Sequence, residues 1–193
     1  YGATPELLDF WDRNGYRTVH LSTTRNATSG EYSAIMLDPT SDAGREVQQR
    51  HTDWFLRRVE GVLADSLDDL EPDVARAALR ATHGTAPLDL SERDWRVVAG
   101  ASYGPGLYGT APRAFRDLAV RHLADPERVD LTAREERLLV RKVLQCRPWD
   151  AVADELDYHS TGQCMRSLGD AYKPLVDVYG TDVAHAERER YTE

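Results

Sequence analysis

Apolar residues recur along the chain with two different periods, and the period changes near residue 40. Between residues 5 and 13 they recur at the three- and four-residue spacing of a helix face. Residues 16–21 and 32–37 instead alternate as strands do, and residues 25–30 between them are typical of a turn. The first forty residues are therefore expected to form a helix followed by a β-hairpin.

The ends of this first helix carry local signals in the sequence. Thr4 is a typical N-cap, and Pro5 suits the first helical position, where a missing N–H costs nothing. Gly15 follows the last apolar residue and can adopt the left-handed conformation that ends a helix. These signals predict a helix that begins at Pro5 and ends shortly before Gly15.

After residue 40 the apolar positions follow the helical period throughout. Capping boxes are predicted at Thr132–Glu135 and Ser160–Gln163, and Ser91 with Asp94 is predicted to open a helix. The charged residues after Gly180 are expected to fray. Helices are predicted at 41–67, from 71, from 91, at 110–123, at 132–145, around 152–156 and from 160 towards 172. The buried face of the first of these is expected to carry Val47, His51, Trp54, Phe55, Val59, Val62 and Leu63.

The charge of the chain bears on whether its surface could bind nucleic acid. Lys and Arg number 24 against 33 Asp and Glu, which gives a net charge of −9, and Lys142 and Lys173 are the only lysines. Acid excess with scarce lysine resembles proteins of extreme halophiles. In molar salt the Debye length is only about 3 Å, so phosphate contacts must be local, and arginine suits them because its planar fork binds phosphate bidentately. The alternative is a surface that does not touch nucleic acid.

Other features narrow the class of protein. No apolar run approaches the length of a membrane helix. Cys146 and Cys164 match no metal spacing, and the six histidines form no ligand cluster, so we expect no metal site. A reduced, cytoplasmic location without a membrane partner is the plain interpretation.

Several motifs together resemble one family of enzymes. The phrase from Phe10 to Tyr16 resembles the step from the last large helix into the next strand of Gcn5-related N-acetyltransferase (GNAT) domains. The sequence at residues 1–8, 25–33 and 41–44 is similar to the corresponding motifs of the tRNA(Met) cytidine acetyltransferases. The resemblance continues to about Gly180.

This resemblance implies an α+β fold in three parts. Residues 1–40 would be the C-terminal remnant of a GNAT domain, 41–180 a mostly helical tail that binds tRNA, and 181–193 a frayed, charged end. The chain lacks a P-loop and the GNAT pyrophosphate loop, so it is expected to be a C-terminal fragment of a halophile-like parent and inactive alone.

The resemblance also implies the function of the parent. It would form N4-acetylcytidine at the wobble position of elongator tRNA(Met), with acetyl-CoA as donor and with ATP bound by an upstream ATPase module. Glu6 and Arg13 occupy positions at which the family contacts acetyl-CoA. The alternative gives them structural roles, because Glu6 favours the helix dipole and Asp9 can pair with Arg13.

The remaining candidates come from the residues themselves. Arg134, Arg137, Arg141 and Lys142 form the densest basic run and are predicted to bind tRNA; a solvated helix face braced by neighbouring glutamates is the alternative. No catalytic residue is identified, although Tyr1, Tyr16 and Tyr32 are candidate acids for a leaving thiolate.

The order of a short helix, a tight turn and a capped second helix over residues 152–168 is typical of a helix-turn-helix. Its second helix would expose Gln163 and Arg166. This leaves two alternatives for the function, a helix-turn-helix regulator that binds nucleic acid and a structural helical dimerisation domain. Because the second helix has little other basic surface, no DNA partner is expected.

Overall fold

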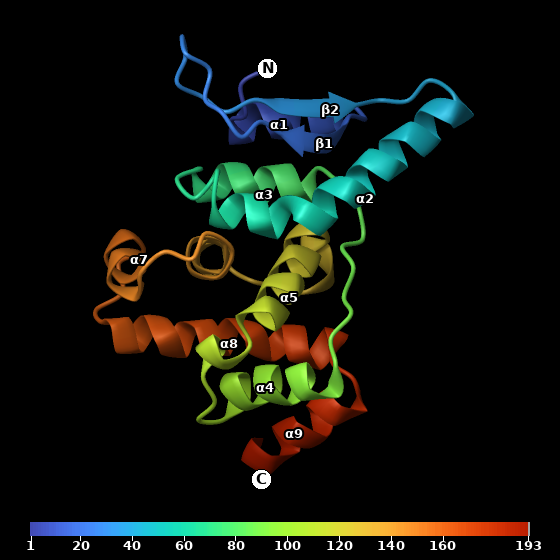
Figure 1. Ribbon diagram of the computed structural model, residues 1–193. Helices are drawn as coiled ribbons and strands as arrows, with labels where there is room; N and C mark the ends of the chain where they lie inside the picture. The colour runs from blue at the N-terminus through green and yellow to red at the C-terminus, as the bar shows by residue number, and fades with distance from the viewer. Residues whose placement is uncertain (193) are drawn as a thin grey trace.

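The computed structural model describes residues 1–192 and places a small sheet and one helix on top of a stack of helices (Figure 1). Helix α1 (Pro5–Arg13) leads into strands β1 (Arg17–Leu21) and β2 (Ala34–Leu37), which pair antiparallel. The prediction of an α+β fold, with a helix and β-hairpin followed by helices, is confirmed.

The hairpin is joined to α1 by a tight turn and to the helices below by a backbone hydrogen bond. Arg17 pairs with Leu37 and Leu21 with Ala34, and an irregularity between Thr18 and His20 interrupts the ladder. The backbone of Gly15 has a φ of 92°, which glycine adopts without strain, so the chain can turn from α1 directly into β1. The amide of Thr18 donates to the carbonyl of Ala81, which ties the sheet to the helices below.

The rest of the described chain is helical. Its longest element is α2, and the end of α6 continues without a break into the π-helical segment η3. The α-helices are α2 (Asp42–Ala64), α3 (Pro72–Arg80), α4 (Glu92–Tyr103), α5 (Pro112–Ala124), α6 (Ala133–Leu138), α7 (Trp149–Glu155), α8 (Thr161–Tyr179) and α9 (Asp182–Thr192). The short segments are η1 (Tyr108–Thr110), η2 (Pro126–Arg128) and η3 (Leu139–Leu144).

Of the two predicted capping boxes one is complete, and a further box forms where Ser91 opens α4. Ser91 with Asp94 and Thr132 with Glu135 each exchange both hydrogen bonds. Ser160 accepts from the amide of Gln163, but the side chain of Gln163 accepts from the amide of His159 and not of Ser160. The predicted box at Ser160 is therefore only half formed.

Two expectations about the helices need correction. The core face of α2 is formed by Thr52, Phe55, Leu56, Val59 and Leu63, whereas Trp54 is 55% exposed and Val47 and His51 also face solvent.

The second correction concerns the end that was expected to fray. Residues 182–192 form α9, which packs against α4 and fully buries Ala184 (Figure 1). Glu193, the last residue of that expected end, lies outside the described residues.

A single hydrophobic cluster runs through the molecule from the sheet to α9. It joins Leu8 of α1 and Leu21 of β1 to residues of every large helix. Near its centre the buried ring of Tyr172 packs edge-on against Phe115, and its hydroxyl donates to the carbonyl of Phe115 at 2.6 Å. The core is thus continuous across residue 40, where the pattern of the sequence changes.

Candidate functional site

Helix α1 presents Glu6 and Arg13 on one exposed face, two turns apart, as the spacing predicts. The guanidinium of Arg13 is paired with the carboxylate of Asp9, and the two side chains are 72% and 59% exposed. An ion pair so open to water contributes little to stability, so it leaves Arg13 available to a ligand.

A pocket of about 360 Å³ opens between α1 and α3 beside Glu6. Its walls combine acidic side chains from α1 with Arg76 and Arg80 from α3, and Arg13 is not part of them. A second pocket of about 550 Å³ shares both of those arginines and extends towards His83 and the segment 124–131. Arg76 and Arg80 were not singled out from the sequence, although their four-residue spacing on a helix was a signal that they share a face.

The second pocket is floored by a buried network of charges. Glu136 accepts hydrogen bonds from Arg76, whose Nε lies 2.7 Å away, and from His122 at 3.2 Å. Burial alone would raise the pKa of Glu136, but the bonds from His122 and Arg76 outweigh it and lower that pKa. Because every one of these groups comes from a different helix, the network fastens α3, α5 and α6 together.

Arg141, predicted to bind RNA, lies inside the molecule. Its side chain is 8% exposed and donates to Glu155 at 2.7 Å, to the carbonyl of Leu70 at 2.9 Å and to Gln145 at 3.0 Å. Arg141 lies within the π-helical segment η3 and faces the turn after α2. Arg141 and Gln145 thereby satisfy carbonyls of the turn after α2.

The other three predicted RNA-binding residues also make contacts within the chain. Arg137 binds both carboxylate oxygens of Asp73 on α3, at 2.9 and 2.7 Å, while its side chain remains 40% exposed. Arg134 stacks over Tyr158 and donates to backbone carbonyls before α8, and it is exposed. Lys142 donates to the carbonyl of Arg147 at 2.7 Å. The four side chains therefore form neither one solvated face nor one basic surface.

The candidate tyrosine acids lie in different settings. The hydroxyl of Tyr32 donates to Asp69 at 2.6 Å, and Tyr16 packs edge-on against Trp11. The Tyr1 hydroxyl contacts the sulfur of Met36, and burial raises its pKa to about 12. Tyr16 thus packs on a neighbouring ring, and the hydroxyl of Tyr32 bonds to the turn after α2.

The segment that resembled a helix-turn-helix is built into the body of the molecule. Helix α8 packs along α4 and α6 as well as against α7. Gln163 is used at the N-terminus of α8, and Arg166 is exposed. The pair of helices thus has a packing role that needs no nucleic acid.

Comparison with known proteins finds relatives that are named as acetyltransferases. A family model described as GNAT acetyltransferase 2 matches residues 1–41. The chain is 68% identical over 191 residues to a tRNA(Met) cytidine acetyltransferase of Haloferax volcanii, and 53% identical over 192 residues to one of Haloarcula marismortui. Each alignment covers 99% of this chain.

A further protein with the same name, from Nitrosococcus halophilus, is 37% identical over 191 residues, or 98% of this chain. The chain spans about a quarter of the length of these relatives, 25% of the first two and 26% of the third. In residues 1–192 no helix has both the length and the apolar character needed to cross a membrane.

Proposed function

Because the chain belongs to the tRNA(Met) cytidine acetyltransferase family, as its motifs predicted, we propose that it is a working part of such an enzyme. The observation that carries this proposal is the 68% identity over 191 residues. The whole enzyme would transfer an acetyl group from acetyl-CoA to a cytidine of tRNA(Met), and we place this reaction in the cytoplasm.

The chemistry proposed is an acyl transfer to a weak nucleophile. The exocyclic N4 of the wobble cytidine attacks the thioester carbonyl, the bond to sulfur breaks, the thiolate of coenzyme A leaves and N4 loses one proton. The lone pair of N4 is delocalised into the pyrimidine ring, so rate must come largely from positioning. ATP, bound outside this chain, would help to place the elongator tRNA(Met).

For acetyl-CoA we propose Glu6 and Arg13 as contacts. Both side chains are exposed on the same face of α1, and the partner of Arg13 holds it only weakly. A guanidinium suits a phosphate of the coenzyme, and a carboxylate can accept from its amides.

For RNA we propose that Arg134 and Arg137 reach the phosphates from α6. Their exposure supports this role, whereas the buried head of Arg141 and the inward bond of Lys142 support a structural role for those two. The contacts would recognise backbone shape, since a folded tRNA presents phosphates and 2′-hydroxyls along its stems.

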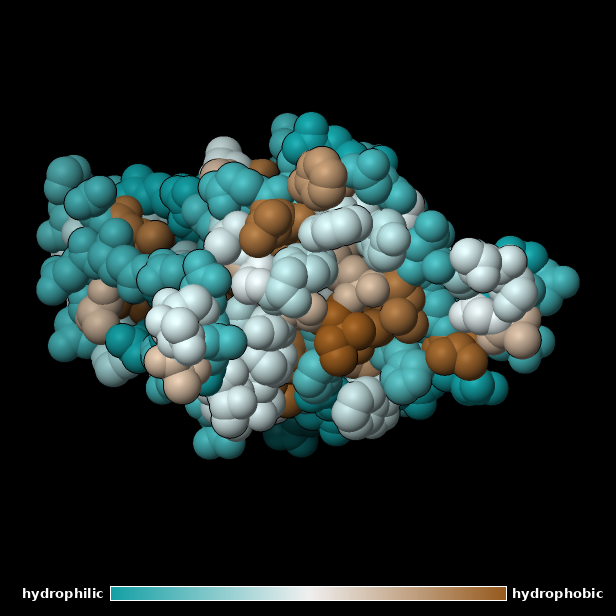
Figure 2. Space-filling view, turned by 90° about the horizontal axis from the view of Figure 1, so that it is seen from above, coloured by the Kyte–Doolittle hydropathy of each residue, from teal (hydrophilic) through white to brown (hydrophobic). Residues whose placement is uncertain are grey.

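The exposed apolar residues on the upper face of the molecule support the proposal that residues 1–40 belong to a larger acetyltransferase domain. Figure 2 looks down on this face, where hydrophobic side chains lie at the surface. Phe10 of α1 is 51% exposed and Ile35 of β2 is 52% exposed. Apolar surface beside a two-stranded sheet is typical of a face that further protein covers.

The proposal is tested by acetyl transfer with the complete gene product. It should incorporate label from acetyl-CoA into an unmodified tRNA(Met) transcript when ATP is present, and digestion should release N4-acetylcytidine. A transcript with uridine at the wobble position is the matched control and should remain unlabelled. Equal labelling of both transcripts, or none of either, would contradict the proposed reaction.

A further inference from the structure

The outer half of α2 projects from the body of the molecule (Figure 1). No residue of α2 before Thr52 is buried, so this half contributes nothing to the core. Helical stability in proteins comes mostly from packing an apolar face, and among the side chains of this half Gln48 donates to the carbonyl of Leu37 of β2 at 2.7 Å. The projecting half is therefore expected to have a partner outside the described residues.

One side of this helix has the composition of a binding surface. Val47, Arg50, His51, Trp54 and Arg58 recur at three- and four-residue spacing and so lie on one side, which we call the α2 surface. More than half of the Trp54 side chain is open to solvent. The apolar area and the arginines are thus presented together.

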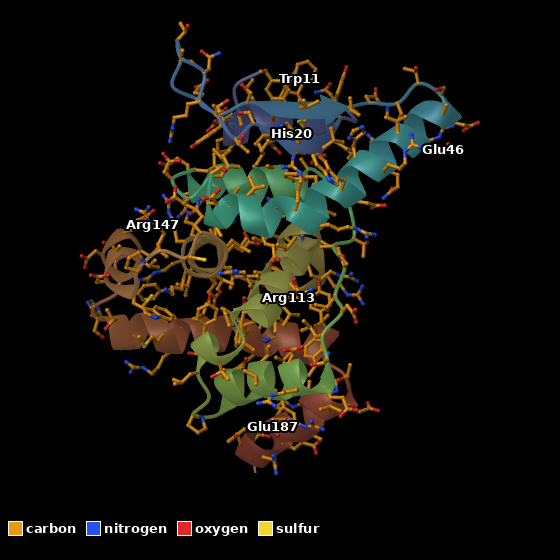
Figure 3. All side chains as sticks on the ribbon, in the orientation of Figure 1. Trp11, His20, Glu46, Arg113, Arg147 and Glu187 are labelled. Atoms are coloured by element: carbon orange, nitrogen blue, oxygen red, sulfur yellow. The ribbon has the colours of Figure 1, made fainter. Side chains whose placement is uncertain are left out.

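Arg58 is held in place on this surface without any carboxylate. Its guanidinium lies 4.1 Å from the centre of the Trp54 ring and within 2.5 Å of Nδ1 of His20 on β1. Figure 3 labels His20 on the sheet beside α2 and Glu46 near the outer end of the helix. The Nε atom of Arg58 is buried and has no hydrogen-bond partner within residues 1–192. Although this Nε is closed to solvent, no carboxylate among residues 1–192 pairs with the guanidinium, so its charge is left for an external anion.

The charge of the α2 surface is opposite to that of the whole chain. None of its five residues is acidic, although the chain carries a net charge of −9. Neither Arg50 nor Arg58 forms an ion pair with any residue that the structure describes. A polyanion with flat, stackable groups matches an open indole flanked by two unpaired guanidiniums.

We infer that the α2 surface binds RNA, with a base of tRNA stacked on Trp54 and phosphates bound by Arg50 and Arg58. This inference rests on the proposed function and adds a second RNA contact to it, on a different helix from Arg134 and Arg137. Aromatic stacking tolerates any base, and arginine adds a cation–π contribution, so this contact carries affinity without reading sequence.

The test is binding of an unmodified tRNA(Met) transcript to the complete gene product, in molar potassium chloride and at lower salt. Trp54→Ala should weaken binding roughly five- to a hundredfold, the usual worth of one stacked base. Trp54→Phe should restore most of the affinity. Arg50→Gln should lower the slope of log K against log salt by roughly one unit. Arg93→Gln, the same change on α4 at the far end of the molecule, should alter neither affinity nor slope.

A second measurement locates the contact directly. Ultraviolet cross-linking to the same transcript, followed by digestion with trypsin, should attach a nucleotide to the peptide of residues 51–57, which contains Trp54.

The outcomes separate the two proposals. If the wild type acetylates the transcript but Trp54→Ala binds it equally well at both salts, the α2 surface is not an RNA contact and the proposed function stands. If Trp54→Ala instead unfolds or dissociates the complete protein, the surface is a protein interface and the inference is overturned. If the wild type neither binds nor acetylates tRNA, the proposed function fails.

Discussion

Arg141 shows how one residue can be recognised as important and assigned the wrong environment. In the sequence it belongs to a basic run, and in the structure its guanidinium is buried against Glu155 and a backbone carbonyl. Sequence spacing could not reveal this, because the groups that bury Arg141 come from α7 and from the turn after α2, which only tertiary packing brings to η3.

We predict that Arg141→Ala lowers the free energy of unfolding by about 1.5–3 kcal/mol, the worth of hydrogen bonds that involve a charged group. The loss arises because Glu155 is left without its buried partner. Denaturant unfolding in molar salt measures it, with Arg93→Ala, an exposed arginine on α4, as the control. Unchanged stability would show that Arg141 is not a structural residue.

Arg13 is the converse case, an exposed residue whose removal should spare the fold. Arg13→Ala in the complete gene product is predicted to weaken acetyl-CoA roughly ten- to a hundredfold, through loss of a charge-assisted phosphate contact worth about 1.5–3 kcal/mol. Calorimetric titration measures the affinity. Arg45→Ala removes a comparably exposed ion pair from α2 and should have no effect. An unchanged affinity would leave Arg13 as no more than the partner of Asp9.

Asp117 on α5 is expected to destabilise the fold near neutral pH. Burial, together with the neighbouring Glu60, raises its pKa from 3.8 to about 6. The folded state binds a proton on the Asp117 carboxyl more tightly than the unfolded state does. The stability that comes from this proton is therefore fully present below pH 3.8 and is lost as pH rises through 6. The substitution Asp117→Asn should therefore raise the free energy of unfolding by about 1–3 kcal/mol at pH 7 and leave it unchanged at pH 4. Unfolding curves at both pH values, with exposed Asp130→Asn as control, decide whether the gain depends on pH.

Among the elements, those with local signals were predictable and those that depend on distant contacts were not. Ser91 and Thr132 start their helices with capping boxes that the sequence contains in full. Helix α9 was missed because it is held by packing on α4, which buries Ala184, and charged sequence alone gives no sign of that contact. Trp54 was assigned to the core because its spacing fits α2, but whether a helix face is buried depends on what lies opposite it.

The junction between α3 and α6 offers a test at the same scale. Arg137 lowers the pKa of Asp73 from 3.8 to about 2 through a paired hydrogen bond. The stability that this pair supplies is present above pH 3.8 and is lost as pH falls towards 2.

A double-mutant cycle of Asp73→Asn and Arg137→Ala should give a coupling of about 0.5–1.5 kcal/mol at pH 7, discounted for the exposure of both groups, and almost none at pH 2. A coupling of the same size at both pH values would mean that the two helices interact through packing and not through charge.

At the scale of the whole molecule, one core joins the part that resembles an acetyltransferase to the helical part. The sequence motifs within residues 1–44 identified the family, and the comparisons with known proteins confirm it. The candidate site was only partly predictable. The resemblance to the family implies Glu6 and Arg13, and helix spacing places them on one face, whereas the pockets between α1, α3 and α6 arise only from tertiary packing.

The central claim is that this chain is a working part of an enzyme that acetylates tRNA(Met). The most direct measurement is mass spectrometry of tRNA(Met) purified from cells in which the gene has been deleted and then restored. N4-acetylcytidine should disappear on deletion, return with the complete wild-type gene and return only in part with Arg13→Ala. An unchanged content of N4-acetylcytidine in the deletion strain would contradict the account.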